Sequence, residues 1–142
     1  RDKKVLIVIS DGGDNASARS LAHVLKMAEQ SSALVYTIGT FHEDDPDAYP
    51  KVLSRLAQAT GGEAFFPGEL SDVVAICERI ARDIRNQYTI GYVSTNTARN
   101  GAYRAIRVVV GAKGKSTLSV RTRAGYTATG GEPRLGKNQG AK

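Results

Sequence analysis

The chain has 142 residues, of which 41% are hydrophobic, and it carries a formal net charge of +6. This length suits one domain with a real core and excludes two domains of ordinary size. No apolar run approaches the roughly 18 residues that a membrane span requires, and the single cysteine excludes an internal disulfide.

The charge is distributed unevenly along the chain. Residues 1–98 carry 10 Lys and Arg against 13 Asp and Glu, whereas residues 99–142 carry 10 against one acid, Glu132. The basic character therefore belongs to the C-terminal third. Because the first residue is Arg1 rather than Met, we expect a processed product or an excised piece, with any export signal upstream.

The first apolar run, residues 5–9, predicts a strand covered on both faces, as in parallel sheets. It leads directly into Ser10-Asp11-Gly12-Gly13-Asp14, and ligands of such sheets gather just past the carboxyl ends of the strands. Asp11 is therefore the candidate site residue, with Ser10 and Asp14 as neighbours. The same residue types shape turns and cap helices, so a purely structural role for Asp11 stays open.

Strands and helices are predicted to alternate as far as residue 87. Apolar spacings of three and four predict helices that begin near Ser17, around residue 52 and at Ser71. Apolar runs predict further strands at residues 33–39 and 63–66. The alternation predicts an α/β fold of the Rossmann-like, three-layer kind, with three parallel strands. Cys77 falls in the apolar stripe of the last helix, so we expect a buried thiol.

From residue 88 the apolar period changes to two. The alternating runs cover residues 88–93, 106–110 and 118–120. With turn residues between them, these runs predict an antiparallel β meander over residues 88–128. Residues 129–142 are rich in Gly, Lys and Asn and are predicted to form a disordered basic tail.

The order of three segments, V-L-I-V-I-S-D-G-G-D-N, A-L-V-Y-T-I-G and L-A-Q-A-T-G-G-E-A-F-F, resembles the second half of a von Willebrand factor type A (VWA) domain. The continuation, R-D-I-R-N-Q-Y-T-I-G-Y, Y-R-A-I-R-V-V-V and V-R-T-R-A-G-Y, is similar to a bacterial subfamily that carries a β-rich C-terminal extension. The resemblance implies that residues 1–87 are the C-terminal half of a VWA-like domain. Its strands would be the fourth, fifth and sixth of a sheet ordered 3-2-1-4-5-6, with residues 88–128 as the extension.

The resemblance also implies a function. VWA domains hold Mg²⁺ or Mn²⁺ at a metal-ion-dependent adhesion site, and an acidic side chain of a protein partner completes the metal shell. Asp11 matches the aspartate of the T/S-D-G turn, with Ser10 beside it, but the chain contains no D-x-S-x-S motif. The site is therefore expected to be incomplete and to bind its cation weakly. Oxygens from Asp14 or from the acidic loop 43–47 stay open as additions, and relatives suggest an exported, periplasmic or cell-surface location.

Two other functions compete with this binding module. A phosphate-ester hydrolase that uses Asp11 lacks a Gly-x-Ser-x-Gly or P-loop motif, and His23 and His42 have no evident relay partner. The chain is therefore predicted not to be an enzyme. The basic C-terminal region could bind nucleic acid or an anionic surface through the arginines of its predicted strands. These are Arg104, Arg107, Arg121 and Arg123. No aromatic stacking set accompanies them, which favours an ordinary solvated strand face.

The predicted sheet leaves one edge open. In a complete VWA sheet the strand at residues 5–9 has neighbours on both sides, and here it has lost one. An uncovered apolar edge favours association. We therefore expect self-association through residues 5–9, or cover of this edge by the chain's own C-terminal meander.

Overall fold

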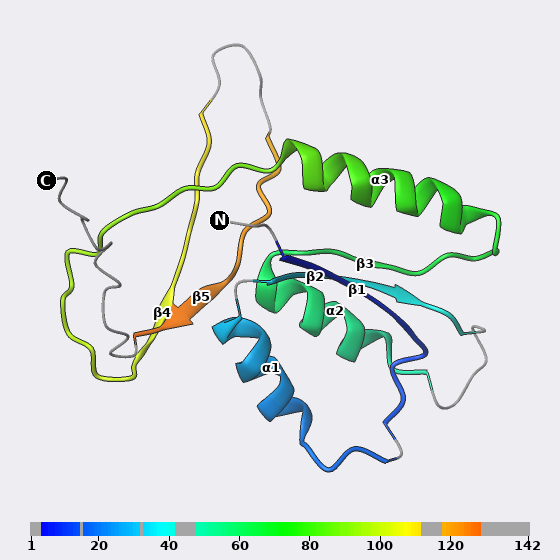
Figure 1. The fold of residues 1–142 in the computed structure, drawn as a ribbon, viewed down its shortest axis with the longest axis horizontal. Coiled ribbons are helices and arrows are strands. Elements are labelled where there is room, and N and C mark those ends of the chain that lie inside the picture. Colours follow the sequence, from blue (N-terminus) through cyan, green and yellow to red (C-terminus); the bar gives the residue numbers. More distant parts are fainter. Residues whose placement is uncertain (1–3, 15, 32, 42–47, 112–117, 129–142) are drawn as a thin grey trace, which may run out of the picture.

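A three-stranded parallel sheet lies at the centre of the computed structural model, which describes residues 4–14, 16–31, 33–41, 48–111 and 118–128 (Figure 1). In chain order the elements are β1 (Lys4–Ser10), α1 (Leu21–Gln30), β2 (Ala33–Gly39), α2 (Pro50–Thr60), β3 (Ala64–Phe65), α3 (Asp72–Asn86), β4 (Tyr103–Ala105) and β5 (Gly125–Thr127). The alternating strands and helices predicted for residues 5–86 are confirmed. The predicted tail, 129–142, and the acidic loop, 43–47, lie outside the described residues.

The sheet has the order β1-β2-β3, with both pairs parallel. β2 is central and pairs with β1 along its whole length, from Lys4 opposite Ala33 to Ser10 opposite Gly39. β3 contributes only two residues, of which Ala64 pairs with Thr37. The carboxyl ends of β1 and β2 therefore meet at one edge, which is the edge that holds Asp11.

Helices cover both faces of the sheet, with α3 on one side and α2 on the other (Figure 1). On the α3 side, Ile80 is 1% exposed and packs with Tyr36 and Ile38 of β2 and with Phe65 of β3. Along β2, Tyr36 and Ile38 alternate with the residues that face α2, as a strand buried on both faces requires. The hydrophobic core thus lies around β2.

Two threonines fix α2 against β2. Thr60 Oγ1 accepts a hydrogen bond from Val35 N (2.9 Å), and Thr37 Oγ1 donates to Leu53 O (3.2 Å). Both threonines are buried, so these bonds satisfy polar groups that would otherwise lose water without replacement.

β1 is not covered on both faces, and that prediction was wrong. Leu6 is 51% exposed, Ile7 44% and Ile9 63%. The exposure results from tertiary packing. β1 lies at the edge of the sheet, and α1 packs mainly against α2 and β5 instead of β1. An apolar run indicates a strand, but it does not say which elements will cover it.

Two details of the helices also differ from the sequence prediction. α1 begins at Leu21, because Ser20 is its N-cap, whereas Ser17 N donates to Asp14 Oδ1 (2.9 Å) in the preceding turn. Cys77 is exposed, not buried. The covered face of α3 carries Ile76, Ile80 and Ile84, and Cys77 lies at the margin of that face. The predicted apolar stripe was too wide.

The C-terminal region forms a small antiparallel sheet in place of the predicted meander. β4 pairs with β5, with Arg104 opposite Tyr126. The predicted runs 88–93, 106–110 and 118–120 carry no strand. Tyr88 is 92% exposed and Val93 95%, so the alternating side chains have no core to face.

The segment formed by residues 118–128, called here the C-terminal strap, is anchored at the amino edge of the parallel sheet. Arg121 pairs with Glu63, just before β3, and with Asp83 of α3. Arg123 Nη2 donates to Glu29 O (2.6 Å) and Ser31 O (3.0 Å) at the C-terminal end of α1. Cations stabilise that end of a helix because its last carbonyls lack partners. The strap therefore lies at the edge opposite Asp11.

We expect Arg123→Ala to lower the free energy of unfolding by about 1.5–3 kcal/mol, the usual range for hydrogen bonds to a charged group. Urea denaturation followed by circular dichroism measures this change. Arg107→Ala is the matched control, because Arg107 is an exposed arginine of the same region. Equal midpoints for the two variants would contradict the anchoring role of Arg123.

Candidate functional site at the carboxyl edge

Asp11 lies directly after β1, in a loop pinned to its neighbours by backbone bonds. Thr40 N donates to Ser10 O and Tyr49 N donates to Asp11 O, both at 3.1 Å. Gly12 has φ +85°, and a Cβ there would lie 2.7 Å from Tyr49 O. Only glycine fits this left-handed position so close to backbone. The turn therefore presents Asp11 in one fixed place.

The Asp11 carboxylate is exposed and is oriented by its own turn. Its Oδ1 accepts a hydrogen bond from Gly13 N (3.0 Å) and one from Ser10 Oγ (3.3 Å), and Ser10 Oγ in turn accepts from Gly12 N (3.0 Å). This is the turn-shaping role that the sequence left open. Oδ2 accepts no hydrogen bond from the described residues, so one carboxylate oxygen is available to a ligand.

Asp14 is the second acid of this loop. Its Oδ1 accepts the hydrogen bond from Ser17 N, and this bond is the main cause that keeps the pKa of the exposed Asp14 carboxyl below its usual value. Asp14 is thus ionised at neutral pH but already engaged in its own turn.

The donor set at this edge does not complete a cation site within the described residues. Mg²⁺ and Mn²⁺ prefer about six oxygens in octahedral order. No group of three or more His, Cys, Asp or Glu gathers in the part of the chain that the structure describes. Asp11 supplies an anchoring oxygen, and the remaining ligands would come from other residues and from water.

Within the described residues, His23 has no partner that would suit a catalytic relay. His23 Nε2 lies 2.6 Å from Arg19 Nη1 on the exposed start of α1, and His42 lies outside the described residues. Neither Ser20 nor any other described hydroxyl group bonds to the His23 ring.

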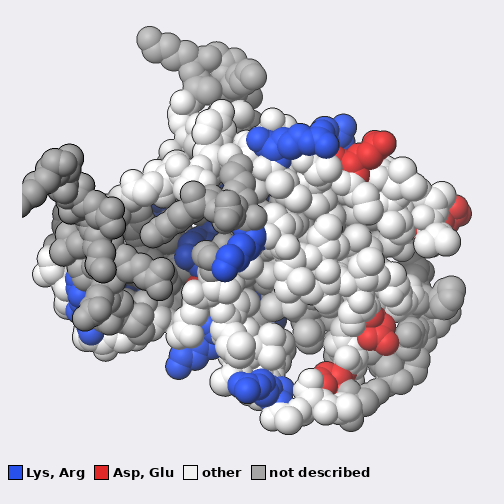
Figure 2. Space-filling view, viewed as in Figure 1, with Lys and Arg blue, Asp and Glu red and all other residues white. Residues whose placement is uncertain are grey.

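Three of the four arginines in the predicted basic stripe are engaged within the chain. Arg121 and Arg123 anchor the C-terminal strap, and Arg107 is exposed. Burial alone would lower the pKa of Arg121, but its bonds to acidic groups raise it. Figure 2 shows the basic side chains on this face as separate patches, not as one stripe.

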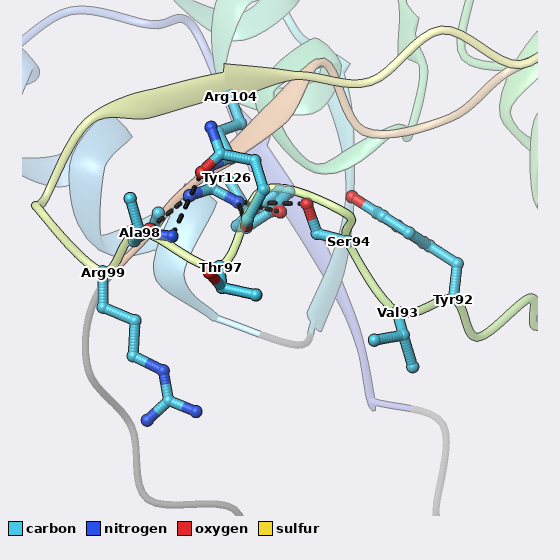
Figure 3. A pocket seen from close by; sticks show the side chains of 10 residues that line it. Tyr92, Val93, Ser94, Thr97, Ala98, Arg99, Arg104 and Tyr126 are labelled. Atoms are coloured by element: carbon cyan, nitrogen blue, oxygen red, sulfur yellow. Dashed lines mark hydrogen bonds between the residues drawn. The ribbon is translucent and has the colours of Figure 1, made fainter.

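Arg104 organises a shallow hollow of about 410 Å³ beside the β4–β5 pair (Figure 3). Its guanidinium donates to Ser94 Oγ (3.1 Å), to Asn96 O (2.5 Å) and to Ala98 O. It also lies over the Tyr126 ring, 5.9 Å from the centroid. Arg104 thus fastens the loop 94–98 to the small sheet, and most of its donors are already used.

Tyr92 and Tyr126 form the aromatic side of this hollow, with ring centroids 6.5 Å apart. Their hydrogen bond raises the pKa of Tyr92 and lowers that of Tyr126. The sequence predicts no aromatic stacking set here, because 34 positions separate Tyr92 from Tyr126. No local sequence pattern predicts such a contact.

No family model matches this chain, and no curated protein matches it. Among solved structures it is similar to an uncharacterised membrane-spanning protein from Vibrio fischeri, with a TM-score of 0.50 and 20% sequence identity. The likeness covers 58% of this chain and 47% of that one, so the match spans about half of the other protein. At this identity the likeness concerns the fold alone. Within the described residues, no helix combines the length and apolar content needed to cross a bilayer.

Proposed function

We propose that this chain is part of a protein-recognition module, the C-terminal half of a VWA-like domain, whose binding edge is the carboxyl edge around Asp11. One observation carries the proposal: an exposed aspartate, held in a Ser-Asp-Gly turn at the end of a parallel strand, with one carboxylate oxygen left for a ligand. The Ser-Asp-Gly turn and the strand-helix order are the features that resemble the VWA family.

In this proposal Asp11 would hold a divalent cation together with ligands from outside the described residues, and the cation would offer a directional contact to an acidic side chain of a partner. Ser10 and Gly13 hold the Asp11 carboxylate, so little side-chain freedom is lost when it binds. The cation would supply charge neutralisation and an open coordination position. The other oxygen ligands would come from outside the described residues.

The position of the C-terminal strap also supports a binding edge at Asp11. The strap is anchored at the amino edge through Arg121 and Arg123, so it leaves the Asp11 edge uncovered. A partner that approached Asp11 would not have to displace the strap.

Calorimetric titration of the chelator-stripped chain with Mn²⁺ and Mg²⁺ tests the proposal. We expect binding weaker than about 10⁻⁴ M, since one carboxylate and waters form a poor site for a hard cation. Asp11→Ala is expected to abolish the binding. Glu78→Ala is the matched control, because it removes an exposed carboxylate on α3, away from this edge.

Two outcomes would contradict the proposal. Equal cation binding by wild type and Asp11→Ala would place the cation elsewhere. Absence of any heat at millimolar cation would remove Asp11 as a ligand. Micromolar binding that depends on Asp11 would support the site, but it would show that the chain supplies a fuller set of metal ligands than expected.

A further inference from the structure

The C-terminal strap joins the small sheet to the amino edge of the α/β unit. In the described residues β4 and β5 pair only with each other, and β1 pairs only with β2. The predicted cover of β1 by the C-terminal region was therefore wrong. The strap reaches the α/β unit through Arg121-Thr122-Arg123, which contacts α1, α3 and the turn between α2 and β3.

Arg121 lies between two carboxylates that come from different elements. Its Nη1 donates to Glu63 Oε2, and its Nη2 donates to Asp83 Oδ2 of α3. Arg79 donates to the other oxygen of Glu63 (2.7 Å), which holds that carboxylate in place. A planar guanidinium can bridge two carboxylates through separate nitrogens, whereas a lysine ammonium is a single point charge. This pair of acids therefore suits arginine.

Arg123 contacts the C-terminal end of α1. Its Nη2 donates to the carbonyl oxygens of Glu29 (2.6 Å) and Ser31 (3.0 Å), and the residue is half-buried there. The last carbonyls of a helix lack partners within the helix and carry partial negative charge. A second guanidinium, two residues after the first, is thus matched by a second group of acceptors.

Between the two arginines the strap backbone passes directly over Gly61. A Cβ on Gly61 would lie 2.6 Å from Arg123 N and 2.7 Å from Thr122 C, so only glycine leaves room for the strap. Thr122 is exposed, so the backbone and the arginines carry the contact. Gly61, Glu63, Asp83 and the C-terminal end of α1 are called here the arginine cradle.

We propose that the arginine cradle is a binding site for an extended Arg-x-Arg peptide, which the strap occupies as a ligand from the same chain. The partner is a segment of another polypeptide that carries the same two arginines and replaces residues 121–123 when the strap detaches. Charge complementarity favours this partner, because two carboxylates and a helix C-terminus face only one resident cation, Arg79. The cradle lies at the edge opposite Asp11, away from the proposed cation edge.

The contacts of the strap allow it to leave the cradle. The side chains of its ion pairs stay partly exposed, at 37% for Arg121, 26% for Glu63 and 24% for Asp83, and such pairs stabilise only weakly. A tethered segment has an effective concentration of about 1 mM. A free peptide that must be ordered on binding should have a Kd on the order of 10⁻⁴ M. The strap should therefore weaken the binding of free peptide about tenfold.

Titration calorimetry of the full chain with a synthetic peptide of residues 118–124 tests the proposal. The chain with both Arg121→Ala and Arg123→Ala releases the strap, and we expect it to bind the peptide about tenfold more tightly than the wild-type chain. If this variant is partly unfolded, the peptide should raise its urea midpoint, because a ligand of the folded state stabilises that state. Arg107→Ala is the matched control, since Arg107 is exposed and lies outside the strap. It should bind the peptide as the wild type does.

The two acids of the cradle provide a second comparison. Adding Glu63→Gln and Asp83→Asn to the released chain should weaken peptide binding at least about tenfold. Adding Glu78→Gln should leave it unchanged, because Glu78 is an exposed residue of α3 outside the cradle. A peptide in which lysine replaces both arginines should also bind at least about tenfold more weakly.

Three results would overturn the proposal. Equal peptide affinity of the wild-type and released chains would mean that the strap does not occupy the site. Absence of both heat and a shift of the urea midpoint at millimolar peptide would remove the site. Equal binding of the lysine peptide would remove the recognition of arginine. Asp11 takes no part in these measurements, so this proposal and the cation site fail independently.

Discussion

Replacing Gly62 with alanine is expected to lower the free energy of unfolding by more than about 3 kcal/mol, a large part of the stability of a small domain. A Cβ at this position would lie 1.8 Å from Val35 O and 2.7 Å from Val35 C. These are backbone atoms of the buried central strand, so neither can move aside. Gly62 N also donates to Ala57 O (3.0 Å), which closes the end of α2.

Urea denaturation measures this effect, and Gly91→Ala is the matched control. A Cβ at Gly91 would meet nothing within 4 Å, so its effect should stay within about 0.5 kcal/mol. If Gly62→Ala unfolded at the same urea concentration as Gly91→Ala, the close packing of α2 and β2 described above would be incorrect.

Ile80→Ala should cost about 2–5 kcal/mol, the range for removing a large aliphatic side chain from a core. Ile80 is 1% exposed and is the one fully buried residue that α3 contributes to the described core. It fills the space between Tyr36, Ile38 and Phe65. Its loss leaves a cavity between helix and sheet.

Val74→Ala on the same helix is the comparison for Ile80→Ala. Val74 is 66% exposed, so its truncation should change the midpoint of thermal unfolding little, whereas Ile80→Ala should lower it by several degrees. Similar shifts for both variants would mean that α3 does not dock through Ile80.

The strands and helices of the first 87 residues could be predicted because their signals are local. The apolar run at residues 5–9 and the run at 33–39 each specify a strand, and glycine at Gly61 ends α2 with φ +87°. The cover of β1 could not be predicted, since it depends on where α1 packs. The period of two in residues 88–93 was misleading for the same reason: alternation forms a sheet only when a core exists on one side.

The candidate site was predictable in position but not in contacts. Asp11 stood out because it follows a strand directly, and its place at the sheet edge follows from the parallel topology. The backbone of Tyr49, which pins the loop, lies 38 positions away and carries no motif. The cluster around Arg104 could not be predicted, because the pairing of β4 with β5 brings Tyr126 beside Arg104 and the loop 94–98 that Arg104 fastens carries no strand or helix pattern.

The exposed thiol of Cys77 has a practical consequence for studying this chain. Since it is the sole cysteine of the sequence and lies on the surface of α3, this chain should take up one equivalent of maleimide without any engineering. A nitroxide or fluorophore attached there would stand on a helix that packs against the sheet through Ile76, Ile80 and Ile84. Spectroscopic distances measured from that probe would then report on the whole α/β unit, not on a loosely held loop.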